Sequence, residues 1–344
     1  MRPCHADSLL AGPPAGATLL RVVAKDGGAG FFALLLYALN QMIWADEWRV
    51  ASYVQMGEWC ADGQRNKYFD RVSGPNVWEY FFEPTAPPAW VRSAHAFQLD
   101  FKQLYALHHC VNSSIFSYPH GMYSYLRSPT WHYDDRWHSM MRARADAALA
   151  RHVSIKPHVL ERTRAFYRER ILAQGVSKPL LGIHMRGTDK LNAIAGRIIQ
   201  PSEYSALISQ YLDRHPDALI YLATDSPVFL QQMKADRISS DRLVHYNALR
   251  TRRNAFADPN VTDHYKKGED ALVESLLLSC SNFLVKPASA LSEFAVYFNP
   301  DLHGNTAELQ YTSGALPPVQ VLNAHFMSRR DGLRGMDRCA RVLR

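Results

Sequence analysis

The sequence predicts an α/β protein built from two domains, each containing a parallel sheet. A strand, a helix and a second strand follow one another within residues 19–54, as in a βαβ unit. Strands and helices then alternate regularly from residue 179 to residue 298, which is typical of a doubly wound parallel sheet. With 344 residues, 47% apolar and 11% aromatic, each half is long enough to bury its own core.

The first half is expected to open with a flexible leader at residues 1–17, rich in Gly, Pro and Ala near its end. Apolar patterning then predicts one βαβ unit. Its elements are a strand at 19–24, a tight glycine loop at 26–30, a buried helix at 31–47 and a strand at 49–54. Residues 55–140 are rich in Trp, Tyr, Pro and His without clear periodicity, which is typical of loop-rich structure.

A basic amphipathic helix at 157–173 is predicted to end the first half, because Gly175 is a typical helix stop. The predicted units are an N-terminal Rossmann-like domain at 18–175, a C-terminal Rossmann-like domain at 176–313 and a tail at 314–344 that packs back on the N-terminal domain. The C-terminal domain is predicted to contain strands at 179–185, 218–224, 242–246 and 282–286, and helices at 202–214, 227–234, 268–280 and 289–298.

Charge and hydropathy exclude several classes of protein. The net charge of +7 is spread along the chain, and the Arg-rich segments 142–171 and 327–344 are interpreted as solvated helix faces, so nucleic-acid binding is not expected. The longest apolar stretch, 31–45, is interrupted by Asn40 and Gln41 and is too short for a membrane span. The first twenty residues show no signal-peptide core, so no membrane segment is expected in this sequence.

The five cysteines are Cys4, Cys60, Cys110, Cys280 and Cys339. None of their spacings suits a structural zinc site, and an odd number cannot pair completely within one chain. Cys280 lies in an apolar helical run and is predicted to be a buried thiol. Cys60 and Cys110 are either paired or free.

Polar residues follow three of the predicted strands where each strand ends. They are residues 184–190 (HMRGTDK), 224–226 (TDS) and 286–289 (KPAS). In open α/β sheets, ligands bind beyond the carboxyl ends of the strands. The sequence therefore predicts one ligand crevice lined by all three segments.

The residue types in this crevice suit a nucleoside diphosphate. Arg186 offers a planar fork of donors to a diphosphate oxygen, and Lys190 adds a mobile charge. Ser289 begins a helix whose free N–H groups favour phosphate, and Asp225 can accept hydrogen bonds from sugar hydroxyls. The alternatives are a structural ion pair between Arg186 and Asp189, helix capping by Asp225, and a simple N-cap at Ser289.

Glu274 is a carboxylate within residues 271–278 (ALVESLLL), a helix that is apolar on nearly every side. A lone buried carboxylate is costly and needs donors, which guanine supplies in N1–H and its exocyclic amine. The alternatives are an ion pair with a neighbouring Lys or Arg, or an exposed position at the helix edge.

Two further segments are candidates on the N-terminal side. Gly28 and Gly30, in the loop before the first helix, either approach a pyrophosphate or sugar or form a simple tight turn. His108, His109 and residues 131–138 (WHYDDRWH) are candidates for lining an acceptor groove. A metal site at these histidines is not expected, because no third ligand stands at a suitable spacing.

Three ordered motifs carry a family resemblance. Residues 182–190 (GIHMRGTDK), residues 221–225 (YLATD) and residues 277–285 (LLSCSNFLV) followed by Ser289 resemble the three C-terminal motifs of the α1,6-fucosyltransferase and protein O-fucosyltransferase superfamily. The resemblance covers about residues 178–300, and the loop at 27–30 also resembles the opening of that family's N-terminal domain.

The resemblance implies a GT-B fold with two Rossmann-like domains facing a cleft. It implies GDP-fucose as donor, inversion at the sugar carbon, a glycan or glycoprotein acceptor, a Golgi or ER location, and no metal or other cofactor. The resemblance implies catalysis by Arg186 and donor binding by His184, Asp225, Glu274 and Ser289. The candidates added from the residues themselves are Asp189 for catalysis and Lys190, Gly28 and Gly30 for donor binding. Arg186 would hold the β-phosphate and Glu274 would read guanine.

One departure from the family pattern concerns the catalytic base. In the α1,6 enzymes a glutamate stands four residues beyond the motif lysine, where this chain has Ile194. Core α1,6-fucosylation is therefore not supported. The candidates for the base are Asp189, Asp134, Asp135 and Glu83. Two alternatives stay open: a GDP-sugar-binding pseudoenzyme or lectin-like module, and a GT-B transferase that uses another purine nucleotide sugar.

Overall fold

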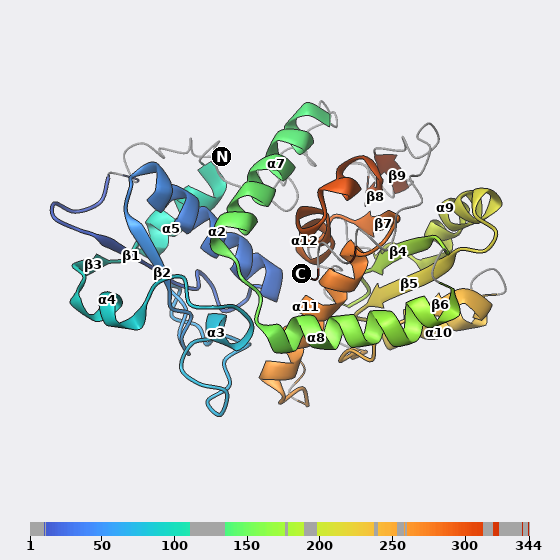
Figure 1. Ribbon diagram of the computed structural model, residues 1–344, viewed down its shortest axis with the longest axis horizontal. Coiled ribbons are helices and arrows are strands. Elements are labelled where there is room, and N and C mark those ends of the chain that lie inside the picture. Colours follow the sequence, from blue (N-terminus) through green and yellow to red (C-terminus); the bar gives the residue numbers. More distant parts are fainter. Residues whose placement is uncertain are drawn as a thin grey trace.

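The computed structural model confirms the predicted α/β class, with two parallel sheets that each carry their own helices (Figure 1). It describes residues 10, 12–110, 135–175, 178–188, 198–236, 240–252, 258, 260–311, 319–322, 339 and 343. Within these ranges no helix is long and apolar enough to cross a membrane.

The N-terminal unit is built on the predicted βαβ unit. Strand β1 (Leu19–Val22) pairs in parallel with β2 (Ala51–Val54) and with β3 (Ala96–Phe97), giving the order β2-β1-β3. Helix α2 (Phe31–Glu47) has the predicted bounds, and both flanking strands are slightly shorter than predicted. The region without clear periodicity also contains the helices α3 (Trp78–Phe81), α4 (Pro88–Ser93) and α5 (Phe101–Cys110).

The C-terminal sheet has the order β6-β5-β4-β7-β8-β9, in which only β9 is antiparallel to its neighbour. The strands are β4 (Leu180–Met185), β5 (Leu219–Thr224), β6 (Leu243–Val244), β7 (Phe283–Pro287), β8 (Thr306–Tyr311) and β9 (Val319–Leu322). Strands β4, β5 and β7 are buried along their whole length, which explains their continuous apolar runs. The four predicted strands are confirmed, whereas β8 and β9 were not predicted.

The helices of this unit match the predicted ones closely. They are α9 (Pro201–Arg214), α10 (Pro227–Ala235), α11 (His264–Ser279) and α12 (Ala290–Phe298). Helix α11 begins four residues before its predicted start, because Asp263 caps it by accepting a hydrogen bond from the Lys266 amide.

Two helices connect the sheets. Helix α7 (Asp135–His152) packs on α12, and helix α8 (Pro157–Phe166) packs on α11. After α8 the chain continues as a π-helical turn (Tyr167–Ile171) and a 3-10 turn (Leu172–Gln174). The predicted stop at Gly175 is confirmed, since its φ of 142° lies in the region that favours glycine.

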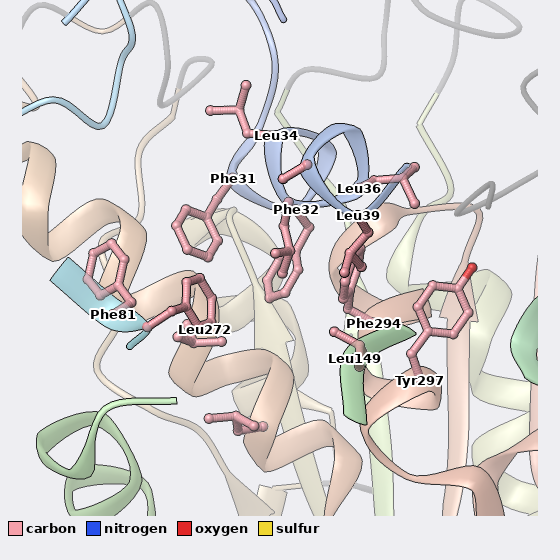
Figure 2. Packing of buried hydrophobic residues seen from close by; sticks show 14 of the residues in the cluster. Phe31, Phe32, Leu34, Leu36, Leu39, Phe81, Leu149, Leu272, Phe294 and Tyr297 are labelled. Carbon is pink, nitrogen blue, oxygen red and sulfur yellow. The ribbon is translucent and has the colours of Figure 1, made fainter. Parts of the chain in front are cut away.

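The two units share one hydrophobic core, in which α2 packs against helices of the C-terminal unit (Figure 2). Phe32 of α2 lies with its ring centroid 5.0 Å from that of Phe294 in α12. At Gly268 of α11, an added Cβ would come within 2.8 Å of the Phe81 ring. The same Cβ would be 3.4 Å from the Phe31 ring, so the start of α2 lies near the N-terminal part of α11.

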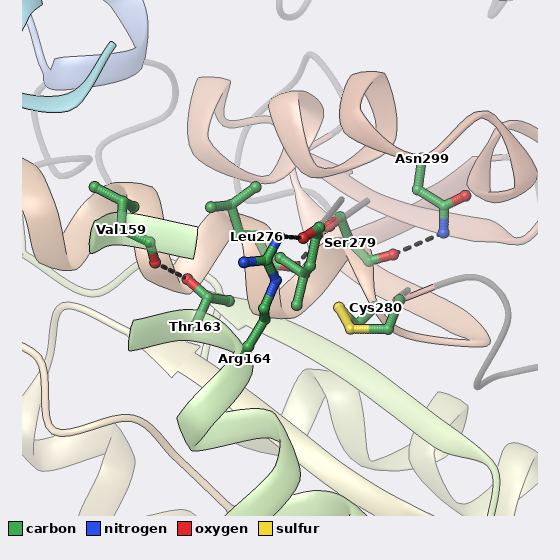
Figure 3. The surroundings of a disulfide bond; sticks show 9 residues. Val159, Thr163, Arg164, Leu276, Ser279, Cys280 and Asn299 are labelled. Atoms are coloured by element: carbon green, nitrogen blue, oxygen red, sulfur yellow. Dashed lines mark hydrogen bonds between the residues drawn. A yellow bond between two sulfur atoms is a disulfide. The ribbon is translucent and has the colours of Figure 1, made fainter. Parts of the chain in front are cut away.

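Two predictions on buried residues were wrong. Cys280 is disulfide-bonded to Cys339 rather than a free thiol (Figure 3), while Cys60 is a buried free thiol. Arg142, in a segment interpreted as a solvated helix face, is buried and donates hydrogen bonds to both carboxylate oxygens of Glu293. Neither interaction is visible in sequence, because the partners are 59 and 151 residues apart.

Candidate functional site

Asp225 holds the loop that follows β4. Strands β4 and β5 are parallel neighbours with Met185 opposite Thr224, so their next residues meet at one edge of the sheet. The Asp225 carboxylate accepts hydrogen bonds from the Gly187 amide at 2.7 Å and from the Thr188 hydroxyl at 2.8 Å. Its Oδ2 also lies 3.5 Å from Nε of Arg186. Asp225 thereby fixes the backbone that presents Arg186.

This arrangement decides between the alternatives for Asp225. The helix cap of α10 is Ser226, whose hydroxyl accepts a hydrogen bond from the Phe229 amide at 3.2 Å. Asp225 therefore does not cap that helix. Its partners belong to the loop carrying the first sequence motif, and Asp189 lies outside the described residues.

Gly187 allows this loop to approach α10 closely. A Cβ at position 187 would lie 2.6 Å from Cβ of Ser226 and 3.1 Å from the Phe229 ring. No real side-chain carbon occupies so short a distance, so only glycine fits without moving the loop or the helix.

We therefore expect Gly187→Ala to displace the loop and to weaken ligand binding there, at a cost of about 1 to 3 kcal/mol in unfolding free energy. Gly28→Ala is the matched control, because its Cβ would meet only an Asp26 oxygen at 3.5 Å. Thermal unfolding of both variants checks this. Equal melting temperatures for the two would contradict the close approach at Gly187.

The carboxyl end of β7 is fixed by buried charges. Lys286 has a fully buried side chain, and its amine lies 2.7 Å from Glu293 and 2.5 Å from Glu308. The two carboxylates hold this amine inside the protein, so it is not presented to a ligand. Arg142 binds Glu293 from the other side, which anchors the first turn of α12.

Ser289 stands at the N-terminus of this anchored helix. It is buried, and its hydroxyl makes no hydrogen bond to its own helix. Ser289 is therefore the N-cap residue of α12 by position, but its side chain does not cap the helix. The helix end, with its positive dipole, follows directly from β7, whose parallel pairing with β4 puts it at the same edge of the sheet as Arg186.

Glu274 pairs with Arg250 inside the protein. Its Oε1 accepts a hydrogen bond from Nη2 of Arg250 at 3.2 Å, and both side chains are more than nine-tenths buried. Burial raises the pKa of Glu274 from 4.5 to about 8, although the positive charge of Arg250 opposes this rise. Among the alternatives for Glu274, the structure shows the ion pair.

The segment carrying Arg250 connects this pair to Asp225. The Thr251 amide donates a hydrogen bond to the backbone oxygen of Asp225 at 3.3 Å, and the Leu249 amide donates to Asp270 at 2.8 Å. The charges of Glu274 and Asp225 are close enough to influence each other. The second motif and the buried pair therefore belong to one polar region.

Arg250 is a site candidate that the sequence analysis missed. Its Nη atoms donate to the backbone oxygens of Ala248 and Tyr246 as well as to Glu274. Its buried Nε has no hydrogen-bond partner in the part of the chain that the structure describes. Arg250 lies in the segment that follows β6. Polar residues at the ends of the other three predicted strands define the crevice, and the same rule applied to β6 would have identified Arg250.

The glycine loop at 27–30 contacts its own unit. The Gly27 amide donates to both oxygens of Asp62, at 3.3 and 3.2 Å, and the Phe31 amide donates to the Tyr68 hydroxyl at 2.7 Å. Gly30 is the residue before α2 and has extended backbone. Donor binding by Gly28 and Gly30 stays a prediction.

The remaining candidates are buried, exposed, or outside the part of the chain that the structure describes. His184 lies in β4 and is buried. His108 is also buried, with Nδ1 3.2 Å from Nδ2 of Asn40, so the prediction that it lines a groove is wrong. Glu83 is exposed in the N-terminal unit. Outside the described residues or side chains lie His109, residues 131–138 with Asp134 and Asp135, and Asp189, Lys190 and Ile194.

Within the described ranges, no three His, Cys, Asp or Glu residues are grouped as a metal site requires. No protein-family model matches the chain, and no curated protein sequence matches it.

Three crystal structures of NodZ are similar to this chain. NodZ alpha-1,6-fucosyltransferase soaked with GDP-fucose has 14% sequence identity and a TM-score of 0.46, and the match covers 89% of this chain and 99% of that chain. The same enzyme co-crystallised with GDP has 13% sequence identity and a TM-score of 0.46, and the match covers 89% of this chain and 98% of that chain. Fucosyltransferase NodZ from Bradyrhizobium has 13% sequence identity and a TM-score of 0.43, and the match covers 89% of this chain and 98% of that chain. The fold class of this chain follows from its own two parallel sheets.

Proposed function

We propose that this chain is an inverting, metal-independent glycosyltransferase that moves fucose from GDP-fucose to a hydroxyl group of a glycan or protein. The observation that carries the proposal is the loop 186–188, which Asp225 holds at the sheet edge beside the buried Glu274–Arg250 pair. The three motifs that resemble fucosyltransferases supply the residues of this region. The donor is assigned to the domain at 176–313 and the acceptor to the domain at 18–175.

The chemistry follows from where charge develops. Glycosyl transfer passes through a cation-like state at the anomeric carbon, and negative charge grows on the departing β-phosphate. A guanidinium already fixed in place stabilises that charge without reorganisation. In this proposal Arg186 has that role, aided by Lys190 and by the N-terminus of α12 at Ser289. The base is a carboxylate, for which Asp189, Asp134, Asp135 and Glu83 remain the candidates.

Guanine recognition is assigned to the Glu274–Arg250 pair. The Glu274 carboxylate would accept hydrogen bonds from N1–H and the exocyclic amine of guanine. Arg250 presents donors beside it, and guanine carries an oxygen acceptor next to N1. The pair thus offers a donor to the guanine oxygen and acceptors to N1–H and the exocyclic amine. Uracil shares the oxygen and the N–H but carries a second oxygen where guanine has the amine, so one carboxylate oxygen would face another acceptor.

GDP is expected to raise the melting temperature without added metal, because a ligand that binds only the folded state stabilises it, by about 2.7 kcal/mol at a hundredfold excess over Kd. UDP should raise it much less. Differential scanning fluorimetry with GDP, UDP and ADP, each with EDTA or with manganese, measures this. Equal shifts for GDP and UDP, or a shift that requires manganese, would argue against the donor assignment.

A catalytically inactive GDP-sugar-binding protein is the second candidate, and Ile194 in place of the family's glutamate favours it. Incubation with GDP-fucose and an array of glycan and peptide acceptors separates the two. Acceptor-dependent GDP release supports the enzyme, whereas GDP binding without release supports the inactive protein.

A further inference from the structure

Lys267 is a buried lysine that has no carboxylate partner among the described residues. Only 8% of its surface is exposed, and it is one of three buried lysines among the described residues. The other two, Lys25 and Lys286, each form an ion pair with an acidic side chain. Within the described part of the chain, Lys267 forms no ion pair.

The Lys267 amine contacts two neutral groups and a histidine. Nζ lies 3.5 Å from the backbone oxygen of Lys67 and 3.5 Å from Nδ1 of His264, and 5.9 Å from the ring centroid of Tyr68. Burial and the charge of Lys67 both lower the pKa of Lys267. Lys267 in turn helps to lower the pKa of His264, which Asp70 partly opposes.

Two helix N-termini meet at this position. Lys267 is the fourth residue of α11, which begins at His264. Tyr68, whose ring centroid lies 5.9 Å from the amine, accepts through its hydroxyl a hydrogen bond from the amide of Phe31, the first residue of α2. At Gly268, an added Cβ would be 3.4 Å from the Phe31 ring. Both helix ends carry partial positive charge, and Asp263 is the acidic cap of α11.

We propose that Lys267 is the centre of an oxyanion-binding subsite between the two units, which takes a phosphate, sulfate or carboxylate group of a ligand. A buried ammonium group is costly unless an opposite charge pairs with it, and the described protein supplies no such group. Charge-assisted hydrogen bonds to an oxyanion would satisfy the amine. Lys67 and His264, which lie 3.5 Å from this amine, are both half-buried, so the proposed subsite is close to the surface.

The oxyanion has two sources that rest on the proposed function: the diphosphate of the donor, or an acidic group on the acceptor. The position of the subsite does not distinguish these two sources, because the subsite contacts both the residues that follow β2 and the start of α11. The subsite itself does not depend on GDP binding, so its test stands apart from that of the proposed function.

The test measures inorganic sulfate binding by calorimetry at constant ionic strength. Wild type and Lys266→Met should bind sulfate alike, because the Lys266 amine is already paired with Asp270 at 2.6 Å. Lys267→Met should bind it at least tenfold more weakly, while melting no earlier than wild type. Sulfate binding by Lys267→Met that equals that of wild type would overturn the proposal.

A second measurement avoids the need for a folded variant. In protein with labelled lysines, NMR titration should show that sulfate raises the pKa of Lys267, and an unchanged value would overturn the subsite. Repeating the calorimetry with saturating GDP identifies the source of the oxyanion. Competition indicates the donor diphosphate, and independent sulfate binding indicates an acidic acceptor. Sulfate binding in a protein that does not bind GDP would support the subsite and contradict the assignment of GDP-fucose as donor.

Discussion

Arg186→Lys is expected to lower kcat by on the order of a hundredfold or more, the usual effect of removing one preorganised donor to the transition state. Lysine keeps the charge but loses the planar guanidinium that grips two phosphate oxygens. It also loses Nε, the atom that faces Asp225 at 3.5 Å, so the remaining cation is no longer held in place. KM for GDP-fucose should change less than kcat.

The fold of this variant should persist, because Asp225 keeps its hydrogen bonds from the Gly187 amide and the Thr188 hydroxyl. Arg242→Lys is the matched control, since Arg242 lies in the same unit and donates to the backbone oxygen of Pro216. That variant should turn over normally. A normal kcat for Arg186→Lys, measured as GDP release, would remove Arg186 from the mechanism.

Glu274→Gln is expected to weaken GDP binding by about ten- to a hundredfold. Glutamine keeps the size of the side chain and one oxygen acceptor, but its amide NH2 group faces the hydrogen-bond donors of guanine. An unpaired buried polar group costs about 1 to 3 kcal/mol, and about 1.4 kcal/mol corresponds to a factor of ten in Kd. Calorimetry with GDP measures this loss directly.

The unliganded Glu274→Gln protein should show a pH-dependent gain in stability. The pKa of Glu274 is raised from 4.5 to about 8 in the folded state, so the unfolded chain releases this proton at lower pH than the folded one. Wild type therefore loses stability from this group as pH rises from about 4.5 to about 8. The variant does not titrate, so its melting temperature should match wild type near pH 5 and exceed it near pH 8.

Glu269→Gln is the matched control for this prediction. Glu269 lies on the same helix, is buried, and pairs with Arg162 at 2.5 Å, but no ligand role is assigned to it. Its variant should bind GDP as wild type does. If Glu274 is only a structural partner of Arg250, Glu274→Gln will instead melt early at every pH and bind GDP normally, and the guanine-reading role fails.

The sequence by itself determined the elements whose signals are local. The long apolar run at 31–47 predicts α2 with its observed bounds, because a helix buried on every side needs no polar face. Apolar strands such as β4 and β5 are recognisable for the same reason. The polar residues that follow them also identify the sheet edge, since parallel strands end together. Strands β8 and β9 escaped prediction because they are defined by their pairing with other strands rather than by a local sequence pattern.

Only the tertiary structure decided which side chains meet. It joined Asp225 to Gly187 across 38 residues and Glu274 to Arg250 across 24. It also left Lys267 buried beside a loop 200 residues away. Hydrogen bonds and ion pairs act over a few ångströms in space, so their energy depends on the final positions of distant segments. Local sequence patterns, which reflect backbone preference and burial, carry no information on those positions.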